Sequence, residues 1–221
     1  MHYITLLTDA YTTVADPASA VEMKRYMRDQ FEYLGIRAPD RRLINKGLIA
    51  QYGLPKAAEL PALIKALWAK PEREYQYAAI DLMQQLHKEW TAADIHLIEY
   101  MITHKSWWDS VDAIASCLAG PWLKKFKTAQ PAVTDKWSRS SDMWLQRTAI
   151  IFQNSYKQHT DEPLLHKYIL QHAHSKEFFI QKAIGWALRE YSKTNPESVR
   201  IFVNSNTLAP LSRREALKRI D

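Results

Sequence analysis

Five residues recur at intervals of 35 along the chain, each within a similar helical segment. They are Arg42, Tyr77, Asp112, Arg147 and Lys182. A fixed period of this length is typical of helical repeat arrays, in which successive repeats place corresponding positions on one face. The sequence therefore predicts a solenoid of helices. Four of the five recurring residues are basic or hydrogen-bonding, and Asp112 is the exception.

Helical periodicity extends along most of the chain, because apolar residues recur three and four positions apart. Caps and breaks divide the pattern into expected helices at about 3–15, 18–33, 40–52, 56–69, 72–89, 92–103, 108–118, 121–129, 131–138, 142–158, 162–172, 176–192, 195–204 and 212–220. We expect no strand, since Gly is scarce and Val- and Thr-rich runs are few. Units of two or three helices at this period resemble HEAT-like repeats, which curve and leave a concave face. We therefore expect one all-α domain over residues 1–221, with a basic concave groove.

The net charge of +6 favours an anionic partner. Lys and Arg are spread along the chain rather than gathered in a tail, which suits a long polyanion better than a small ligand. A single cysteine, Cys117, cannot form an internal disulfide, so we expect a reducing cytoplasm. We find neither a signal peptide at the N-terminus nor an apolar run that approaches the ~18 residues of a membrane span.

One candidate site combines an acid with two indoles. Trp108 lies four residues before Asp112, and Trp186 lies four residues after Lys182, so both indoles are expected to face the groove. A carboxylate in a basic groove is unfavourable for holding phosphate, but it stabilises a positive charge that develops on a sugar. The alternative is that the two indoles belong to the core and that Asp112 pairs with Arg147.

The motif Trp107-Trp108-Asp109-Ser110-Val111-Asp112 resembles the central motif of the AlkD-type DNA alkylpurine glycosylases, the DNA alkylation repair enzyme family. Further similar segments cover nearly the full chain. They are Arg25–Met27, Phe31–Ile36, Pro39–Arg42, Leu67–Glu74, Trp144–Arg147, Phe178–Trp186 and Leu208–Ala216.

The resemblance implies a HEAT-like solenoid that removes cationic purines alkylated at N3 or N7 from double-stranded DNA. It assigns Asp112 as the catalytic carboxylate, Trp108 and Trp186 as the flanking indoles, and Arg147 as the partner of the DNA backbone. It further implies a monofunctional enzyme with no cofactor, no base-flipping pocket and no strand cleavage. We expect a monomer in the bacterial cytosol that associates with the nucleoid while it acts.

Further phosphate contacts are expected from Arg42, Lys105, Ser106 and Lys182, although each can instead be ordinary solvated surface. His172 and His174 lack the neighbours of a metal site, so we expect no metal. Tyr26, Phe178 and Phe179 belong either to the groove or to the core, and Tyr77 has no assigned role. The alternatives to an enzyme are a non-catalytic HEAT-like module that binds DNA or scaffolds proteins, and an RNA-binding repeat protein.

Overall fold

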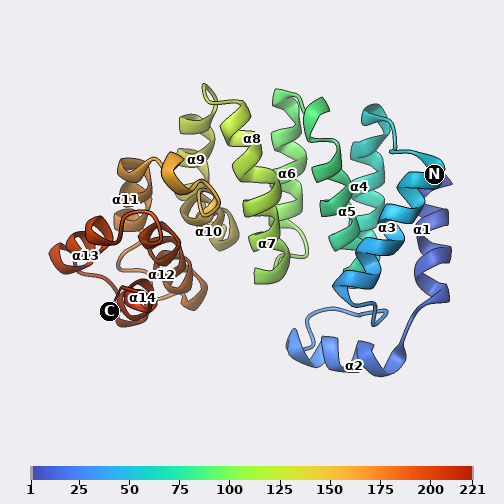
Figure 1. The fold of residues 1–221 in the computed structure, drawn as a ribbon, viewed down its shortest axis with the longest axis horizontal. Coiled ribbons are helices and arrows are strands. Elements are labelled where there is room, and N and C mark those ends of the chain that lie inside the picture. Colours follow the sequence, from blue (N-terminus) through green and yellow to red (C-terminus); the bar gives the residue numbers. More distant parts are fainter. Residues whose placement is uncertain (1, 221) are drawn as a thin grey trace. The chain divides into compact units, whose positions relative to one another are not determined.

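The computed structural model describes residues 2–220, and within them the chain is helical (Figure 1). It divides into two compact units, with the boundary between Thr91 and Ala92. The helices of the first unit are α1 (His2–Thr13), α2 (Pro17–Tyr26), α3 (Ala38–Tyr52), α4 (Leu60–Ala69) and α5 (Arg73–Gln85), with short 3₁₀ turns η1 (Ala57–Glu59) and η2 (His87–Glu89). Between residues 2 and 220 no strand forms, and Glu32 and Glu72 make an isolated parallel bridge.

The second unit begins with η3 (Ala92–Asp94) and α6 (Ile95–Thr103). It continues through α7 (Trp108–Ile114), a π-helical segment η4 (Ala115–Ala119), α8 (Gly120–Lys125), α9 (Gln130–Ser138), α10 (Met143–Ile151), η5 (Lys157–His159), α11 (Glu162–Gln171), α12 (Phe178–Ser192), α13 (Pro196–Ser205) and α14 (Pro210–Leu217). Its core includes fully buried aromatic side chains, among them Trp122, Trp137 and Tyr168. The expected helices are present, although several end earlier than predicted.

The largest departure from the expected helices lies after Tyr26, because a helix was predicted to continue to residue 33. Arg28 and Asp29 instead adopt left-handed backbone angles, with φ of 55° and 58°. The following segment is held by the buried carboxylate of Glu74, which accepts hydrogen bonds from the backbone N–H groups of residues 34, 35 and 36. The carboxylate thus provides the acceptor for backbone donors that no helix satisfies in this segment.

A helix break was expected at Gly120-Pro121, but the chain remains helical from α7 through η4 into α8. A π-helical turn is wider than an α-turn, and it leaves a backbone N–H without a partner. Proline has no N–H, so it can occupy such a position without the loss of a hydrogen bond. Gly120 is needed at this point, since a Cβ there would lie 2.5 Å from the carbonyl oxygen of Phe152. Tyr156 donates a hydrogen bond of 2.6 Å to the carbonyl of Gly120. The π segment therefore begins three residues after Asp112 on a continuous helical stretch.

Near the C-terminus, α14 packs tightly against α12 (Figure 1). A Cβ at Gly185 would lie 2.4 Å from the Cβ of Glu215 and 2.9 Å from the carbonyl oxygen of Ser212. The hydroxyl of Ser212 donates a hydrogen bond of 2.9 Å to the carbonyl of Gln181. This close approach places Glu215 directly beneath the middle of α12.

Candidate active site

A cavity of about 310 Å³ in the second unit is lined by side chains from three helices. The residues that line it are Trp108 and Asp112 from α7, Arg147 from α10, and Phe178, Phe179, Lys182, Trp186 and Arg189 from α12. Three of the residues spaced by 35 thus meet in one cavity. The prediction that Asp112 and both indoles face a common space agrees with this geometry.

Arg147 holds the carboxylate of Asp112 in a bidentate ion pair. Its Nε donates to Oδ1 at 2.7 Å, and its Nη2 donates to Oδ2 at 2.8 Å. Nη1 donates to the backbone carbonyl of Phe179. This fork geometry is the strongest form of arginine–carboxylate contact, and it fixes the plane of the carboxylate.

The two members of the pair differ in exposure. The Arg147 side chain is 5% exposed and that of Asp112 is 19% exposed. Both side chains line the cavity, and the carboxylate is the more exposed member of the pair. Within the protein, the partners of Arg147 are Asp112 and Phe179, and its predicted contact with the DNA backbone stays a prediction. The ion pair of the alternative interpretation is present.

Burial and charge act in opposite directions on Asp112. Removal from water raises the pKa of this carboxyl above its ordinary value, whereas the hydrogen bonds and charge of Arg147 lower it. The neighbouring acid Asp109 adds a smaller upward effect. The negative charge of Asp112 thus depends on Arg147, because burial alone favours the neutral form.

Both indoles are half-buried and line the cavity, so neither is a fully buried core residue. The Nε1–H of Trp186 donates to Oε1 of Glu190, one turn further along α12, at 3.2 Å. This bond restrains the ring of Trp186, which lines the cavity.

Two phenylalanines complete the apolar wall. Phe179 packs against Trp107 and Trp144, with ring centroids 5.1 Å and 5.0 Å apart. Phe178 is 55% exposed. From the sequence, both residues could belong to the groove or to the core. The structure places both at the cavity, and Phe179 also belongs to an aromatic cluster with Trp107 and Trp144.

The basic side of the cavity contains one predicted residue and one that was missed. Lys182 and Arg189 both line it, and both pair with Glu215 of α14, at 3.2 Å and 2.7 Å. Arg189 lies seven residues, or two helical turns, after Lys182, a spacing that would have revealed it. Nothing in the repeat pattern pointed to Glu215.

Lys105 and Ser106 lie in the turn that precedes α7 and are not among the residues that line the cavity. Lys105 has a left-handed φ of 50°. The hydroxyl of Ser106 donates to the carbonyl of Ile102 at 2.6 Å, which closes the end of α6. Their predicted contacts with phosphate stay predictions.

Arg42 and Tyr77 belong to the first unit. Arg42 is exposed and lines a different cavity of about 430 Å³ with Lys46 and Asp81. Its neighbour Arg41 is buried, pairs with Asp81, and lies 5.1 Å from the ring centre of Tyr77. Tyr77 therefore lies against Arg41, the neighbour of the recurring residue Arg42. Tyr26 is 71% exposed on α2.

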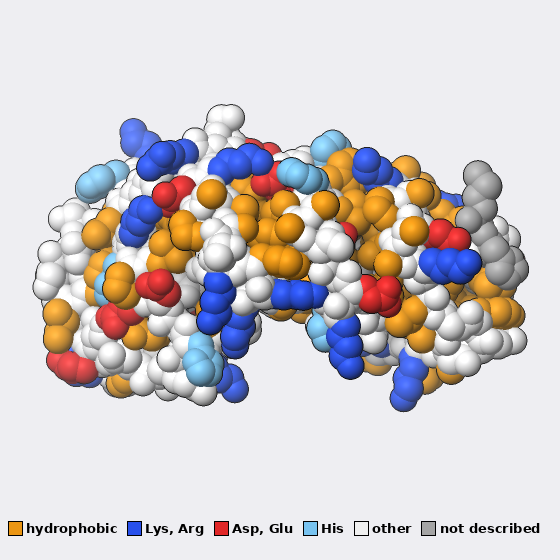
Figure 2. Space-filling model, turned by 90° about the horizontal axis from the view of Figure 1, so that it is seen from above, with side chains coloured by type: hydrophobic (Ala, Val, Ile, Leu, Met, Phe, Trp, Pro, Cys, Tyr) orange, Lys and Arg blue, Asp and Glu red, His pale blue; other side chains and the backbone are white. Residues whose placement is uncertain are grey.

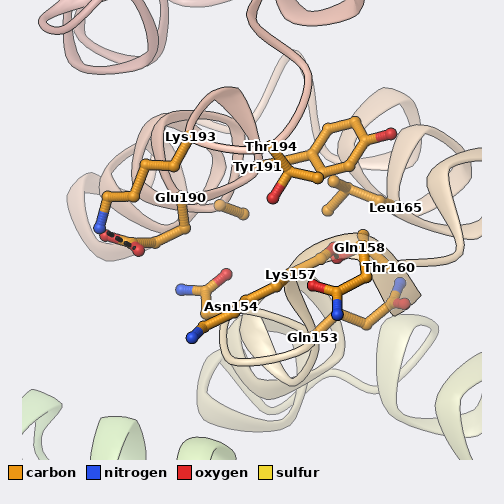
Figure 3. Close-up of a pocket in the computed structure, with 11 residues that line it drawn as sticks. Gln153, Asn154, Lys157, Gln158, Thr160, Leu165, Glu190, Tyr191, Lys193 and Thr194 are labelled. Carbon is orange, nitrogen blue, oxygen red and sulfur yellow. Dashed lines mark hydrogen bonds and ion pairs between the residues drawn. The ribbon is translucent and has the colours of Figure 1, made fainter.

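The second unit has another cavity, of about 490 Å³, beside α12 (Figure 3). Glu190 and Lys193 pair at its edge, and amide side chains of Gln153 and Asn154 lie across from them. Glu190 thus both orients Trp186 and lines this space. The second cavity lacks the combination of a half-buried acid with indole faces that distinguishes the first.

Lys and Arg side chains are spread among acidic and apolar ones over the face shown in Figure 2, as the sequence led us to expect. Among residues 2–220, no group of three His, Cys, Asp or Glu side chains is placed to bind a metal ion. Over the same range, no helix is both long and apolar enough to cross a bilayer.

Comparison with known proteins identifies the family. Residues 7–220 match the family model described as DNA alkylation repair enzyme, and the chain belongs to this family. A solved structure from Enterococcus faecalis, described as a predicted DNA alkylation repair enzyme, is 37% identical, with a TM-score of 0.87, over 93% of this chain and 96% of that one. No curated protein matches the sequence.

Two more distant structures share the fold. AlkD2 from Streptococcus mutans is 18% identical, with a TM-score of 0.66, over 90% of this chain and 99% of that one. The smu.31 protein of Streptococcus mutans UA159 is 19% identical, with a TM-score of 0.63, over 90% and 100% of the two chains. These matches and the observed helices confirm the predicted all-α, HEAT-like fold.

Proposed function

We propose that this protein is a DNA glycosylase that hydrolyses the N-glycosidic bond of cationic purines alkylated at N3 or N7 in duplex DNA. The observation that supports it best is the position of Asp112, a carboxylate in one cavity with the indoles of Trp108 and Trp186. Membership of a DNA alkylation repair family supports alkylated DNA as the substrate.

The chemistry of the lesion explains why one carboxylate suffices. A purine alkylated at N3 or N7 carries a positive charge, so it departs with the electron pair of the glycosidic bond and becomes neutral. The positive charge then passes to the sugar, as an oxocarbenium-like centre. A water adds to C1′, loses a proton, and leaves an abasic site. The enzyme's main task is to stabilise the sugar cation, because the leaving group needs no protonation.

Asp112 can perform this task while it is bound to Arg147. Each carboxylate oxygen has two lone pairs, and Arg147 occupies one on each oxygen. The remaining lone pairs can face a sugar cation or hold the attacking water. Because Arg147 is the more buried partner, its charge lies behind the carboxylate and its fork prevents reorientation during the reaction.

The indoles supply the other half of the site. A cation over an indole face is attracted by about 0.5–2 kcal/mol. Trp108 and Trp186 are therefore suited to pack on the deoxyribose as it becomes positive. In this proposal the protein holds the lesion through sugar and backbone, without an enclosed pocket for the base.

The direct test is release of the damaged base. Purified protein is incubated with methylated duplex DNA, and the free bases are separated and quantified. We expect 7-methylguanine or 3-methyladenine in solution, abasic sites in the DNA, and strand breaks only after alkaline treatment. Absence of both free bases under conditions where the protein binds the DNA would overturn the proposal.

The second candidate is a DNA-binding module without catalysis, and the Asp112–Arg147 pair is the observation that favours it. An ion pair between neighbouring helices is a sufficient structural reason for a buried acid. Such a module would bind the methylated duplex with the usual dependence on salt and release no base.

A further inference from the structure

Glu215 is a buried acid with three cationic partners. Its side chain is 5% exposed, Oε1 lies 2.6 Å from Nζ of Lys218 and 3.2 Å from Nζ of Lys182, and Oε2 accepts from Nη1 of Arg189 at 2.7 Å. The hydrogen bond from Lys218, with those from the other two cations, lowers the pKa of Glu215 to about 2, although burial opposes the shift. The carboxylate is therefore ionised at neutral pH.

The three cations do not lie in equivalent places. Lys182 and Arg189 line the cavity, and Lys218, on α14, is not among the lining residues. The first two are about 10 Å apart along α12 by helical rise, yet both side chains reach the same carboxylate. Trp186 lies between them, four residues after Lys182 and three before Arg189.

The cluster carries more positive than negative charge. Three cations share the carboxylate of Glu215, so this cluster has a net charge of +2. Lys182 is 37% exposed and Arg189 is 23% exposed, so both remain accessible while they hold Glu215. Lysine has three donors and arginine five, so each retains donors for a ligand.

A buried carboxylate beneath two long cations reduces their motion. Free lysine and arginine side chains each lose up to about 2 kcal/mol of rotamer entropy when a ligand immobilises them. Here Glu215 has already restricted them, and the tight contact of Gly185 with α14 fixes the position of Glu215 itself. The two cations are thus preorganised next to the indole.

We propose that Lys182 and Arg189 form a subsite for a backbone phosphate of the DNA strand, and that Glu215 is the residue that positions both cations. The phosphate would be the one adjacent to the deoxyribose that packs on Trp186. The identity of the polyanion rests on the proposed function, whereas the geometry of the subsite rests on the ion pairs.

The experiment measures equilibrium binding of a duplex with a stable abasic-site analogue over a series of salt concentrations. Three matched variants each remove one cation of the same cluster: Lys182→Met, Arg189→Met and Lys218→Met. A phosphate contact contributes about 0.9 to the slope of log affinity against log salt. We expect the slope to fall by that amount in Lys182→Met and in Arg189→Met, and to keep its wild-type value in Lys218→Met. Equal slopes for all three variants would overturn the subsite.

Glu215→Gln tests the positioning role. Loss of a negative charge alone would strengthen binding to every duplex. If Glu215 positions the two cations, the ratio of the affinity for the abasic duplex to the affinity for an undamaged duplex should fall in this variant, even if both affinities rise. An unchanged ratio of the two affinities in a folded variant would show that Glu215 positions nothing. If the variant fails to fold, the three lysine and arginine variants decide the subsite by themselves.

Base release, measured separately, distinguishes this inference from the proposed function. Normal base release together with equal salt slopes would remove the subsite and leave the glycosylase. The expected slopes together with no base release would remove the glycosylase and leave a DNA-binding subsite.

Discussion

Arg147 binds both carboxylate oxygens of Asp112, and the two residues lie 35 positions apart, one repeat from each other, on α10 and α7. The two residues can bind each other because corresponding positions of successive repeats lie side by side. In the proposed function, Arg147 is thereby a positioning residue for the acid. Its ion pair with Asp112 accompanies a 5% exposed side chain, and its contact with the DNA backbone stays a prediction.

The first prediction concerns the pH dependence of base release in Arg147→Met. Arg147 lowers the pKa of Asp112, so its removal lets burial raise that pKa further. Activity that needs the ionised acid is lost as pH falls through this pKa. We therefore expect the acid limb of the pH–rate profile to move to higher pH. A lower rate with an unmoved acid limb would contradict the account.

Arg41→Met supplies the control for that experiment. Arg41, whose side chain is 7% exposed, pairs with the more exposed Asp81 in the first unit. Breaking a buried pair by removing one partner costs about 3–5 kcal/mol. Both substitutions should therefore lower the free energy of unfolding, but only Arg147→Met should shift the pH–rate profile of base release.

The second prediction concerns the indole of Trp186. Replacement by leucine keeps an apolar side chain of moderate size and removes the aromatic face. Because a cation–π contact contributes about 0.5–2 kcal/mol, we expect the rate at saturating DNA to fall roughly 2- to 30-fold. Trp186→Phe should retain an intermediate rate. Single-turnover kinetics measure both, and a rate in Trp186→Leu equal to wild type would exclude the indole from the reaction.

The third prediction compares two helical glycines. Alanine at Gly185 would place its Cβ 2.4 Å from the Cβ of Glu215, so α12 and α14 must separate. We expect a loss of about 1–3 kcal/mol in the free energy of unfolding, as for other overpacked sites. Gly47 meets nothing within 4 Å, so Gly47→Ala should gain about 0.4–1 kcal/mol. Urea denaturation measures both, and a stable Gly185→Ala would contradict the tight packing.

The fourth prediction concerns acid stability. The folded pKa of Glu215 is about 2, below its ordinary value of 4.5. A depressed carboxyl pKa stabilises the folded state above the unfolded pKa, and this contribution is lost as pH falls toward the folded pKa. The stability difference between wild type and Glu215→Gln should thus be greatest above about pH 4.5 and shrink below it. A difference independent of pH would contradict the ionised cluster.

The sequence predicted the candidate site well where the repeats are regular. Asp112, Arg147 and Lys182 share one position in successive repeats, and Trp108 and Trp186 follow from helical spacing, so all five reach one cavity. The same spacing selected Arg42, but the structure places Arg41 against Tyr77.

The partners of these residues were harder to predict. Glu215 lies on α14, outside the repeat register, and reaches the site because Gly185 allows a close approach between helices. The ion pair between Asp112 and Arg147 was foreseen only as an alternative to function. Spacing predicts which side chains share a face, but burial decides that Arg147 points at the acid and not at solvent.

The most direct test of the central claim is the rate of base release by Asp112→Asn. The amide keeps the size of the side chain and part of its hydrogen bonding to Arg147, but it removes the negative charge. Loss of one preorganised electrostatic contact typically costs about 100- to 1,000-fold in rate. Asp81→Asn, in the matched pair with Arg41, controls for lost stability and should keep the wild-type rate. The account predicts that Asp112→Asn binds methylated duplex DNA and releases 7-methylguanine or 3-methyladenine at least about 100-fold more slowly, and full activity in this variant would contradict it.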